Sequence, residues 1–190
     1  MGVFRKLLFA EAARYQEHLL RLDLESRYCR FSGTISDDTI RSYCQAIDWQ
    51  EAAILGFFKD GVLRGVAEIR YDPRAIPKRA ELAFSVERPY QNRGVGSTLL
   101  KRALVVLCNR GIATADMVCQ TQNRRMQRIA LQHQSRYQSE GSDLFIAIDI
   151  PRLSPISLLT EMVEDSQNLM AATIDYAFFF LPGAPGRRLS

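Results

Sequence analysis

Two glycines, Gly94 and Gly96, stand in the segment of this 190-residue chain whose residue types best suit chemistry. They lie between an alternating, strand-like run from Ala80 to Val86 and an amphipathic helical pattern that begins after Ser97. Because glycine has no Cβ, the backbone can turn sharply there and a ligand can approach the amides that open the helix. Those amides lack intrahelical partners and carry the positive end of the helix dipole, so the turn predicts a phosphate or diphosphate site.

Arg88 and Arg93 place mobile positive charge beside this turn. Two glycines can also serve the geometry of a strand-to-helix turn alone, and that interpretation stays open. A dinucleotide-binding fingerprint is another alternative, since Gly94-Val95-Gly96 begins a G-x-G-x-x-G pattern. Leu99 replaces its third glycine, and several residues separate the strand from the first one, so the fingerprint is disfavoured.

The elements on either side of the turn follow from hydrophobic periodicity. Leu82, Phe84 and Val86 share one face of the strand before the turn. The helix after the turn is expected to end at Gly111, a plausible C-cap, and a strand from Ala113 to Cys119 follows. This local unit of strand, helix and strand predicts a parallel pairing.

The rest of the chain predicts hairpins first and a crossover later, which gives an α+β or α/β sandwich around a mixed sheet. The segment from Leu22 to Phe31 is interpreted as a charged, aromatic loop. The other expected elements are helices from Ala10 to Leu22, from an N-cap at Ser36 to about Ile47 and from Asn123 to about Gln134, strands from Ala53 to Phe58, from Val62 to Tyr71 and from Ser142 to Ile150, and a hairpin turn at Lys59-Asp60-Gly61.

The composition suits one globular domain with one core, because 47% of the residues are hydrophobic and 24% are charged. A net charge of +4 with scattered arginines fits anionic small molecules at least as well as nucleic acid. The four cysteines show no C-x-x-C spacing and only two histidines could join them, so no metal site is expected. The apolar stretch from Leu7 to Ala13 is short and interrupted by Glu11, so we expect a cytoplasmic protein without a signal peptide or membrane span.

The C-terminal segment differs from the rest in its pattern. Residues Pro155 to about Ala172 predict an amphipathic helix, and the apolar run from Ile174 to Pro182 is too short to span a bilayer. Exposed, its three consecutive phenylalanines would favour aggregation. We therefore expect a domain of residues 1–151 and an extension of residues 152–190 that packs on the domain or forms a homodimer with a second copy.

The order Gln91-x-x-Gly94-x-Gly96, just after an extended segment that holds Glu81 and Val86, resembles the acetyl-CoA signature of the GNAT superfamily of N-acetyltransferases. The resemblance covers residues 10 to 150, approximately, and implies a GNAT-like, mostly antiparallel central sheet flanked by helices. It also implies acetyl-CoA as the cosubstrate. The expected reaction transfers the acetyl group to a primary amine, of a protein lysine or a small molecule, by direct attack in a ternary complex.

The resemblance assigns roles to individual positions. The strand backbone at Phe84, Ser85 and Val86 would pair with the pantetheine arm, and an amide near Val86 would face the thioester carbonyl as an oxyanion donor. Asn123 would contact the pantetheine, although it could equally be a plain N-cap. The turn expected to hold the diphosphate consists of Gln91, Asn92, Arg93, Gly94, Val95, Gly96 and Ser97.

Glu81 corresponds to the strand position at which many family members carry the general base that deprotonates the amine. A carboxylate with an ordinary pKa is a poor base for an ammonium group, so partial burial that raised its pKa would help. The alternative is an exposed strand glutamate paired with Arg70 or Arg79.

The chain departs from the family where a tyrosine commonly protonates the departing thiolate. Ala130 stands at that position, with Gln134-Ser135 in place of the family's Gly-Phe, and the nearest substitutes are Tyr137 and His133. The departure keeps open an alternative function, a catalytically weak sensor or regulatory domain that binds acetyl-CoA or CoA.

Two further features leave alternatives open. The segment from Leu22 to Phe31 is similar to one that lines the acceptor side in many family members, or it is a solvated loop. Arg124, Arg125 and Arg128 suit a nucleic-acid-binding module, but beside a diphosphate site they fit the 3′-phosphate of the cofactor more economically. We therefore expect neither a nucleic-acid nor a membrane partner.

Overall fold

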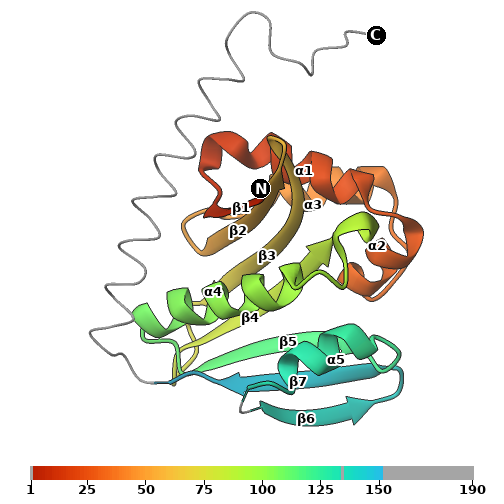
Figure 1. Cartoon of the computed structure of the whole chain (residues 1–190). Coiled ribbons are helices and arrows are strands. Elements are labelled where there is room, and N and C mark those ends of the chain that lie inside the picture. The colour runs from red at the N-terminus through yellow and green to blue at the C-terminus, as the bar shows by residue number, and fades with distance from the viewer. Residues whose placement is uncertain (1, 134, 152–190) are drawn as a thin grey trace, which may run out of the picture.

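The computed structural model describes residues 2–133 and 135–151 of the chain (Figure 1). The helix predicted from Pro155, the extension of residues 152–190 and the dimer contact expected from it lie outside the described residues. Within the described part, no helix combines the length and the apolar character needed to cross a membrane.

The described residues form a seven-stranded sheet in the order β1-β2-β3-β4-β5-β7-β6. Every neighbouring pair is antiparallel except β4 and β5, which are parallel. This arrangement confirms the predicted mixed, mostly antiparallel sheet. The strands are β1 (Gly2–Lys6), β2 (Ala52–Lys59), β3 (Val62–Asp72), β4 (Arg79–Val86), β5 (Thr114–Gln120), β6 (Ser135–Glu140) and β7 (Asp143–Asp149).

Helices cover both faces of the sheet. Alternate side chains of β2 therefore enter two separate cores, one on each face. Ala53, Leu55 and Phe57 pack in the core that contains α4, whereas Ile54 and Phe58 pack in the core that contains α1 and α3. The helical elements are η1 (Phe9–Glu11), α1 (Ala12–Arg21), α2 (Leu24–Phe31), α3 (Asp37–Gln45), η2 (Arg88–Tyr90), α4 (Val95–Asn109) and α5 (Arg124–Ala130).

Strands β4 and β5 pair for three residues only and then separate (Figure 1). The pairing joins Arg79–Glu81 to Thr114–Asp116, although β4 continues to Val86 and β5 continues to Gln120. From Leu82 onward, the edge of β4 that faces β5 therefore has no strand partner. An unpaired strand edge presents backbone donors and acceptors to whatever lies beside it.

Several local predictions are confirmed. Ser36 caps α3 by accepting a hydrogen bond from the Thr39 amide, and Asp60 and Gly61 form the hairpin turn with φ of 54° and 73°. Gly111 follows α4 with φ of 66°, as a C-terminal glycine does. These signals are local in sequence, so periodicity and turn chemistry were sufficient to find them.

Other predictions are wrong in detail. The segment from Leu22 to Phe31 is not a loop, because Leu24–Phe31 forms α2, which has no fully buried residue and hence a weak apolar signal. Strands β1 and β6 were not predicted; β6 is almost entirely exposed and polar. Helix α5 ends at Ala130 and not near Gln134.

Asp23 is the N-cap of α2, because its Oδ1 accepts a hydrogen bond from the Ser26 amide at 2.9 Å. We expect Asp23→Ala to lower the free energy of unfolding by about 1 kcal/mol, because a helix amide then loses its acceptor. Denaturant unfolding measures this value. Asp38→Ala, which removes a 98% exposed carboxylate that does not cap α3, is the control, and an equal loss in both variants would contradict the assignment.

Candidate functional site

A pocket of about 300 Å³ opens where β4 and β5 separate. Its walls come from α2, from the end of β4, from the glycine turn before α4 and from α5. Nine residues singled out from the sequence line it, namely Phe84, Ser85, Val86, Gln91, Asn92, Gly94, Gly96, Ser97 and Asn123. The structure thus brings together residues from three separate elements that were predicted to share a site.

Two predicted residues of the turn lie outside the pocket wall. Arg93 is exposed, and Val95 is buried in the core beneath α4. Gly94 is the N-cap of α4 with φ of 78°, a conformation that residues with side chains rarely adopt, and it offers no side chain to the first amides of the helix. A Cβ at Gly96 would lie 3.1 Å from Ile129 Cδ1, so glycine also allows α5 to approach the turn.

Gln91 ties the walls of the pocket together. Its Nε2 donates to the Val86 carbonyl at 2.8 Å and to Ser26 Oγ at 3.2 Å, while its Oε1 accepts from Arg125 Nη1 at 2.5 Å. These bonds link the end of β4 to α2 on one side and to α5 on the other. Gln91 therefore fixes the distance between the walls of the pocket, a role that the sequence pattern did not indicate.

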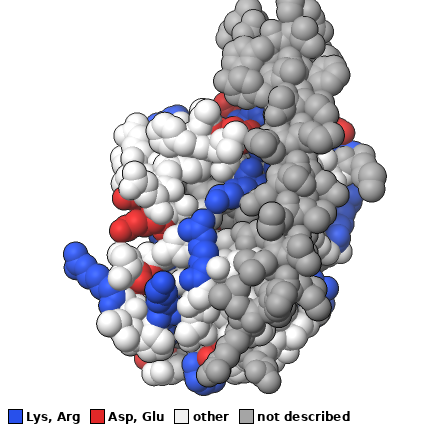
Figure 2. Space-filling model, turned by 90° about the vertical axis from the view of Figure 1, so that its left-hand side faces the viewer, with Lys and Arg blue, Asp and Glu red and all other residues white. Residues whose placement is uncertain are grey.

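The charge of the pocket wall favours an anionic ligand. Arg125 and Arg128 line it from α5, whereas Glu25 of α2 lies 3.9 Å from Arg88. Asn123 Oδ1 accepts a hydrogen bond from the Met126 amide at 3.1 Å, so the residue is the N-cap of α5, as one of its two interpretations from the sequence expected. Figure 2 shows a different side of the molecule, the one on the left in Figure 1 where α4 ends, and there the visible Lys and Arg side chains lie among uncharged and acidic ones.

Glu81 lies at the last position at which β4 pairs with β5, and it lines a second pocket of about 230 Å³. Its side chain is exposed, so it lacks the partial burial that was expected to suit a base. The two arginines considered as its partners bind other carboxylates: Arg70 Nε donates to Glu68 at 2.6 Å and Arg79 Nε to Asp116 at 2.7 Å.

The second pocket rests on a buried carboxylate, Glu68 of β3, which sequence reasoning missed. Tyr15 and Tyr43 donate their hydroxyls to it, and Arg30 Nη2 donates at 2.6 Å. Burial acts to raise the pKa of Glu68, but Arg30 and the other donors outweigh it and hold this pKa below its ordinary value. The charged form is therefore fixed by its partners, and Glu68 is poorly suited to accept a proton.

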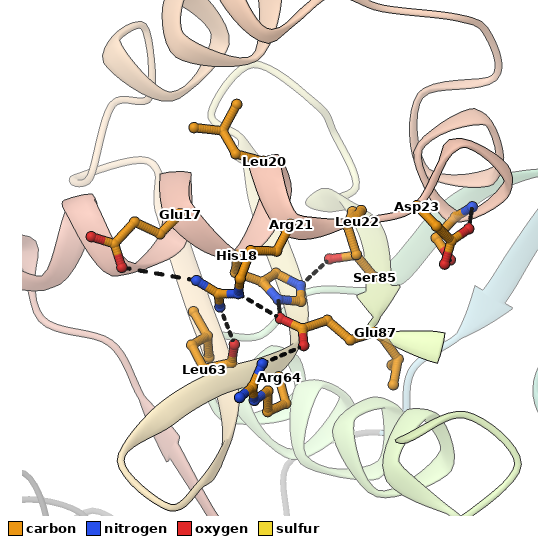
Figure 3. Close-up of polar contacts among 12 residues, drawn as sticks. Glu17, His18, Leu20, Arg21, Leu22, Asp23, Leu63, Arg64, Ser85 and Glu87 are labelled. Atoms are coloured by element: carbon orange, nitrogen blue, oxygen red, sulfur yellow. Dashed lines mark hydrogen bonds and ion pairs between the residues drawn. The ribbon is translucent and has the colours of Figure 1, made fainter. Parts of the chain in front are cut away.

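A second buried cluster joins α1, β3 and the end of β4 (Figure 3). His18 Nε2 lies 2.9 Å from Ser85 Oγ, and His18 Nδ1 lies 3.4 Å from Glu87 Oε1. Glu87 also accepts from Arg21 Nε at 3.0 Å and from Arg64 Nη1 at 2.7 Å. The sequence indicated Ser85 for its backbone alone, because the partner of its side chain, His18, lies 67 residues away.

The environment sets the protonation of this cluster. Burial acts to raise the pKa of Glu87, but the hydrogen bonds from His18 and Arg64 and the neighbouring positive charges lower it to about 2. Burial lowers the pKa of His18, and the opposing effect of Glu87 does not restore it. At neutral pH the cluster therefore holds an ionised carboxylate beside a neutral imidazole.

The candidates for a thiolate acid do not line the pocket between β4 and β5. Tyr137 lies on β6 with 45% of its surface exposed, and His133 follows α5. Ala130 is fully buried in the core. Among the described residues, no group of three His, Cys, Asp or Glu side chains is arranged to hold a metal ion.

Comparison with known proteins identifies the family. The family model described as the acetyltransferase (GNAT) family matches residues 18–133, which is more than half of the chain. The chain therefore belongs to the GNAT family of acetyltransferases. This membership confirms the resemblance found in the sequence and, with it, acetyl-CoA as the cosubstrate. Among curated protein sequences, none matches the chain.

Solved structures share the fold at low sequence identity. The GNAT domain of PAT from S. lividans is 21% identical, with a TM-score of 0.66 over 78% of this chain and 90% of that one. The PaiA N-acetyltransferase of Thermoplasma acidophilum, in complex with coenzyme A, is 20% identical, with a TM-score of 0.58 over 78% and 99%. The ribosomal-protein-S18-alanine N-acetyltransferase of Escherichia coli is 16% identical, with a TM-score of 0.61 over 82% and 97%.

The depressed pKa of Glu87 gives the folded protein a specific acid sensitivity. Its ionised form stabilises the fold fully above the ordinary value of 4.5, and this contribution is lost as the pH falls from 4.5 toward about 2. We expect Glu87→Gln to lower the free energy of unfolding at neutral pH, and its deficit relative to wild type to shrink over that window. Denaturant unfolding at several pH values measures this difference.

The matched control is Glu17→Gln, since Glu17 lies 3.9 Å from the same Arg21 but is 65% exposed. Its effect on the free energy of unfolding should be small at every pH. A deficit for Glu87→Gln that stayed constant down to the acid limit would contradict the assigned direction of the pKa shift.

Proposed function

We propose that this protein is an N-acetyltransferase that transfers the acetyl group of acetyl-CoA to a primary amine by direct attack in a ternary complex. The observation that carries the proposal is the pocket formed where β4 leaves β5, directly beside the glycine turn that opens α4. An unpaired strand edge next to free helix amides suits a ligand that joins an amide-bearing arm to a diphosphate. Acetyl-CoA is such a ligand.

The proposed binding mode uses backbone more than side chains. The edge of β4 at Phe84 and Ser85 would accept the pantetheine amides as an added strand. The amides between Val95 and Ser97 would take the diphosphate, because Gly94 leaves them without a side-chain cap. Asn92 and Arg93 of the turn would lie beside the diphosphate, and Arg125 and Arg128 would neutralise the 3′-phosphate.

The amine would enter from the second pocket, where we propose Glu81 as the general base. The two pockets adjoin along β4, since one is lined by Glu81, Leu82 and Ala83 and the other by the residues that follow. Neither Arg70 nor Arg79 neutralises Glu81. An amine acceptor also agrees with the similar N-acetyltransferases, one of which acts on the alanine of ribosomal protein S18.

A change of charge at Gly94 tests the diphosphate site. We expect Gly94→Asp to weaken the binding of acetyl-CoA at least tenfold, because it places a carboxylate about 4 Å from a diphosphate, where like charges repel by ~1 kcal/mol even in bulk water and more at a protein surface. Isothermal titration calorimetry at physiological salt measures the affinity. Asparagine has the shape of aspartate without its charge and tolerates the same φ. Gly94→Asn should therefore retain more of the affinity for acetyl-CoA than Gly94→Asp. Equal losses in both variants would point to backbone strain and not to a diphosphate.

Removal of the proposed base tests the reaction itself. We expect Glu81→Gln to lower kcat about 10²-fold while leaving the affinity for acetyl-CoA unchanged, since the amine would lose its proton acceptor. Thiol release from acetyl-CoA over a panel of amines and peptides measures kcat. Glu140→Gln, an exposed strand glutamate outside both pockets, is the control and should match wild type. Binding of acetyl-CoA without turnover on any acceptor would instead indicate a sensor.

A further inference from the structure

The cluster of Ser85, His18 and Glu87 has the connectivity of an acid–base relay. A carboxylate holds one nitrogen of an imidazole, and the other nitrogen meets a hydroxyl. That hydroxyl belongs to Ser85, a residue that lines the pocket between β4 and β5. The cluster therefore begins at the pocket wall and continues into the buried side of the sheet.

The chemistry of the partners fixes where the protons lie. Glu87 is ionised and can only accept, so the proton of the neutral imidazole sits on Nδ1. His18 Nε2 then carries a lone pair, and the Ser85 hydroxyl donates to it across 2.9 Å. This is the one tautomer in which the serine oxygen can take up a new proton while it passes its own to the histidine.

The groups that surround His18 allow it to accept a proton only transiently. Glu87 contributes a negative charge, and Arg21 from α1 and Arg64 from β3 contribute two positive charges through that same carboxylate. Arg21 also donates to the Leu63 carbonyl at 2.7 Å, so its position is fixed. Burial, together with the charge of Arg21, outweighs the opposing effect of Glu87 and disfavours a lasting imidazolium, so a proton received there is readily given back.

Packing alone gives little reason for this cluster. His18 is fully buried, and Ser85 and Glu87 are nearly so, although apolar side chains of similar volume are often at least as stabilising in such positions. Titratable groups with perturbed pKa values that adjoin a pocket are frequent at functional sites. The chain also lacks the tyrosine that commonly protonates the thiolate, since Ala130 stands there and is buried.

We propose that Ser85, His18 and Glu87 form a relay that carries the proton of the attacking amine to the departing thiolate. The inference rests on the proposed acetyl transfer and supplies the acid that the sequence lacks. Ser85 touches the reacting atoms, His18 holds the proton in transit, and Glu87 is a positioning residue that orients the imidazole.

The amine, made neutral beforehand by loss of its ammonium proton to Glu81, attacks the thioester carbonyl and forms a carbon–nitrogen bond, which leaves a positive nitrogen and a negative oxygen. The nitrogen gives its proton to Ser85 Oγ while the serine gives its own to His18 Nε2. The carbonyl then re-forms, the carbon–sulfur bond breaks with its electron pair on sulfur, and the same two transfers run in reverse to protonate the thiolate. The products are the amide and coenzyme A, and the relay returns to its initial state.

The test compares Ser85→Ala with Ser85→Thr, which restores the hydroxyl on a residue well suited to a strand. Steady-state thiol release with the full chain gives kcat and KM for an accepted amine. We expect Ser85→Ala to lower kcat at least tenfold with little change in the KM for acetyl-CoA, and Ser85→Thr to recover most of that loss. Ser139→Ala, an exposed serine of β6 outside both pockets, should behave as wild type.

The pH profile separates a relay from a merely structural role. In wild type, protonation of His18 should block the relay, so kcat should fall on the acid side, below the ordinary histidine value because burial lowers this pKa. Ser85→Ala should lose the part of the acid limb that comes from His18, since its residual rate no longer passes through the histidine, and it should keep the part that comes from the general base. His18→Gln keeps a hydrogen-bonding side chain but cannot carry a proton, and it should match Ser85→Ala in kcat. If His18→Gln fails to fold, the two Ser85 variants decide alone.

Two outcomes would overturn the relay while the proposed function survives. One is a wild-type kcat and pH profile in Ser85→Ala. The other is an acetyl group found on Ser85 by mass spectrometry of the enzyme with acetyl-CoA, because the hydroxyl would then act as a nucleophile. Failure of the wild-type chain to transfer acetyl to any amine would instead overturn the proposed function and the relay with it.

Discussion

The early separation of β4 from β5 is the constraint on which the site depends. A sheet normally satisfies the backbone groups of an inner strand on both sides, but β4 has a strand partner toward β5 for only three residues. The remaining edge of β4 must be kept apart from its surroundings. Gln91 does this, because its three hydrogen bonds bridge β4, α2 and α5. A pocket results in which a ligand can complete the hydrogen bonding that the sheet leaves open.

Two buried carboxylates fix the helices on the side of the sheet that faces α1. Glu68 gathers Tyr15 of α1, Arg30 of α2 and Tyr43 of α3, and Glu87 gathers His18 and Arg21 of α1 together with Arg64 of β3. Loss of one member of such a cluster leaves a buried charge without its partner, which costs more than the pair gains. Helix α1 is therefore anchored at both clusters, since Tyr15 binds Glu68, which lines the second pocket, and His18 contacts Ser85, which lines the first.

The sequence was sufficient for features whose causes are local. The turn of Gly94 and Gly96, the N-caps at Ser36 and Asn123 and the parallel β4-α4-β5 unit were all predicted from residues close in sequence. Helix α2 was missed because its apolar stripe is weak and its stability depends on a cap and on packing. The clusters around Glu68 and Glu87 were missed for a different reason: most of their partners lie 25 to 69 residues apart, and no periodicity reports such contacts.

The resemblance to the family implies a tyrosine at position 130, where this chain has alanine. The surroundings of α5 and α1 account for this difference. Helix α5 has seven residues and ends at Ala130, whose side chain is directed into the core, so a large side chain there would need space that the core already fills. Ser85 faces the opposite side of β4 from that core and meets His18 of α1. A proton donor supplied through Ser85 would reach the pocket from the strand itself. In that case α5 would not need to supply the proton donor for the thiolate, and it would provide only an N-cap and positive charge.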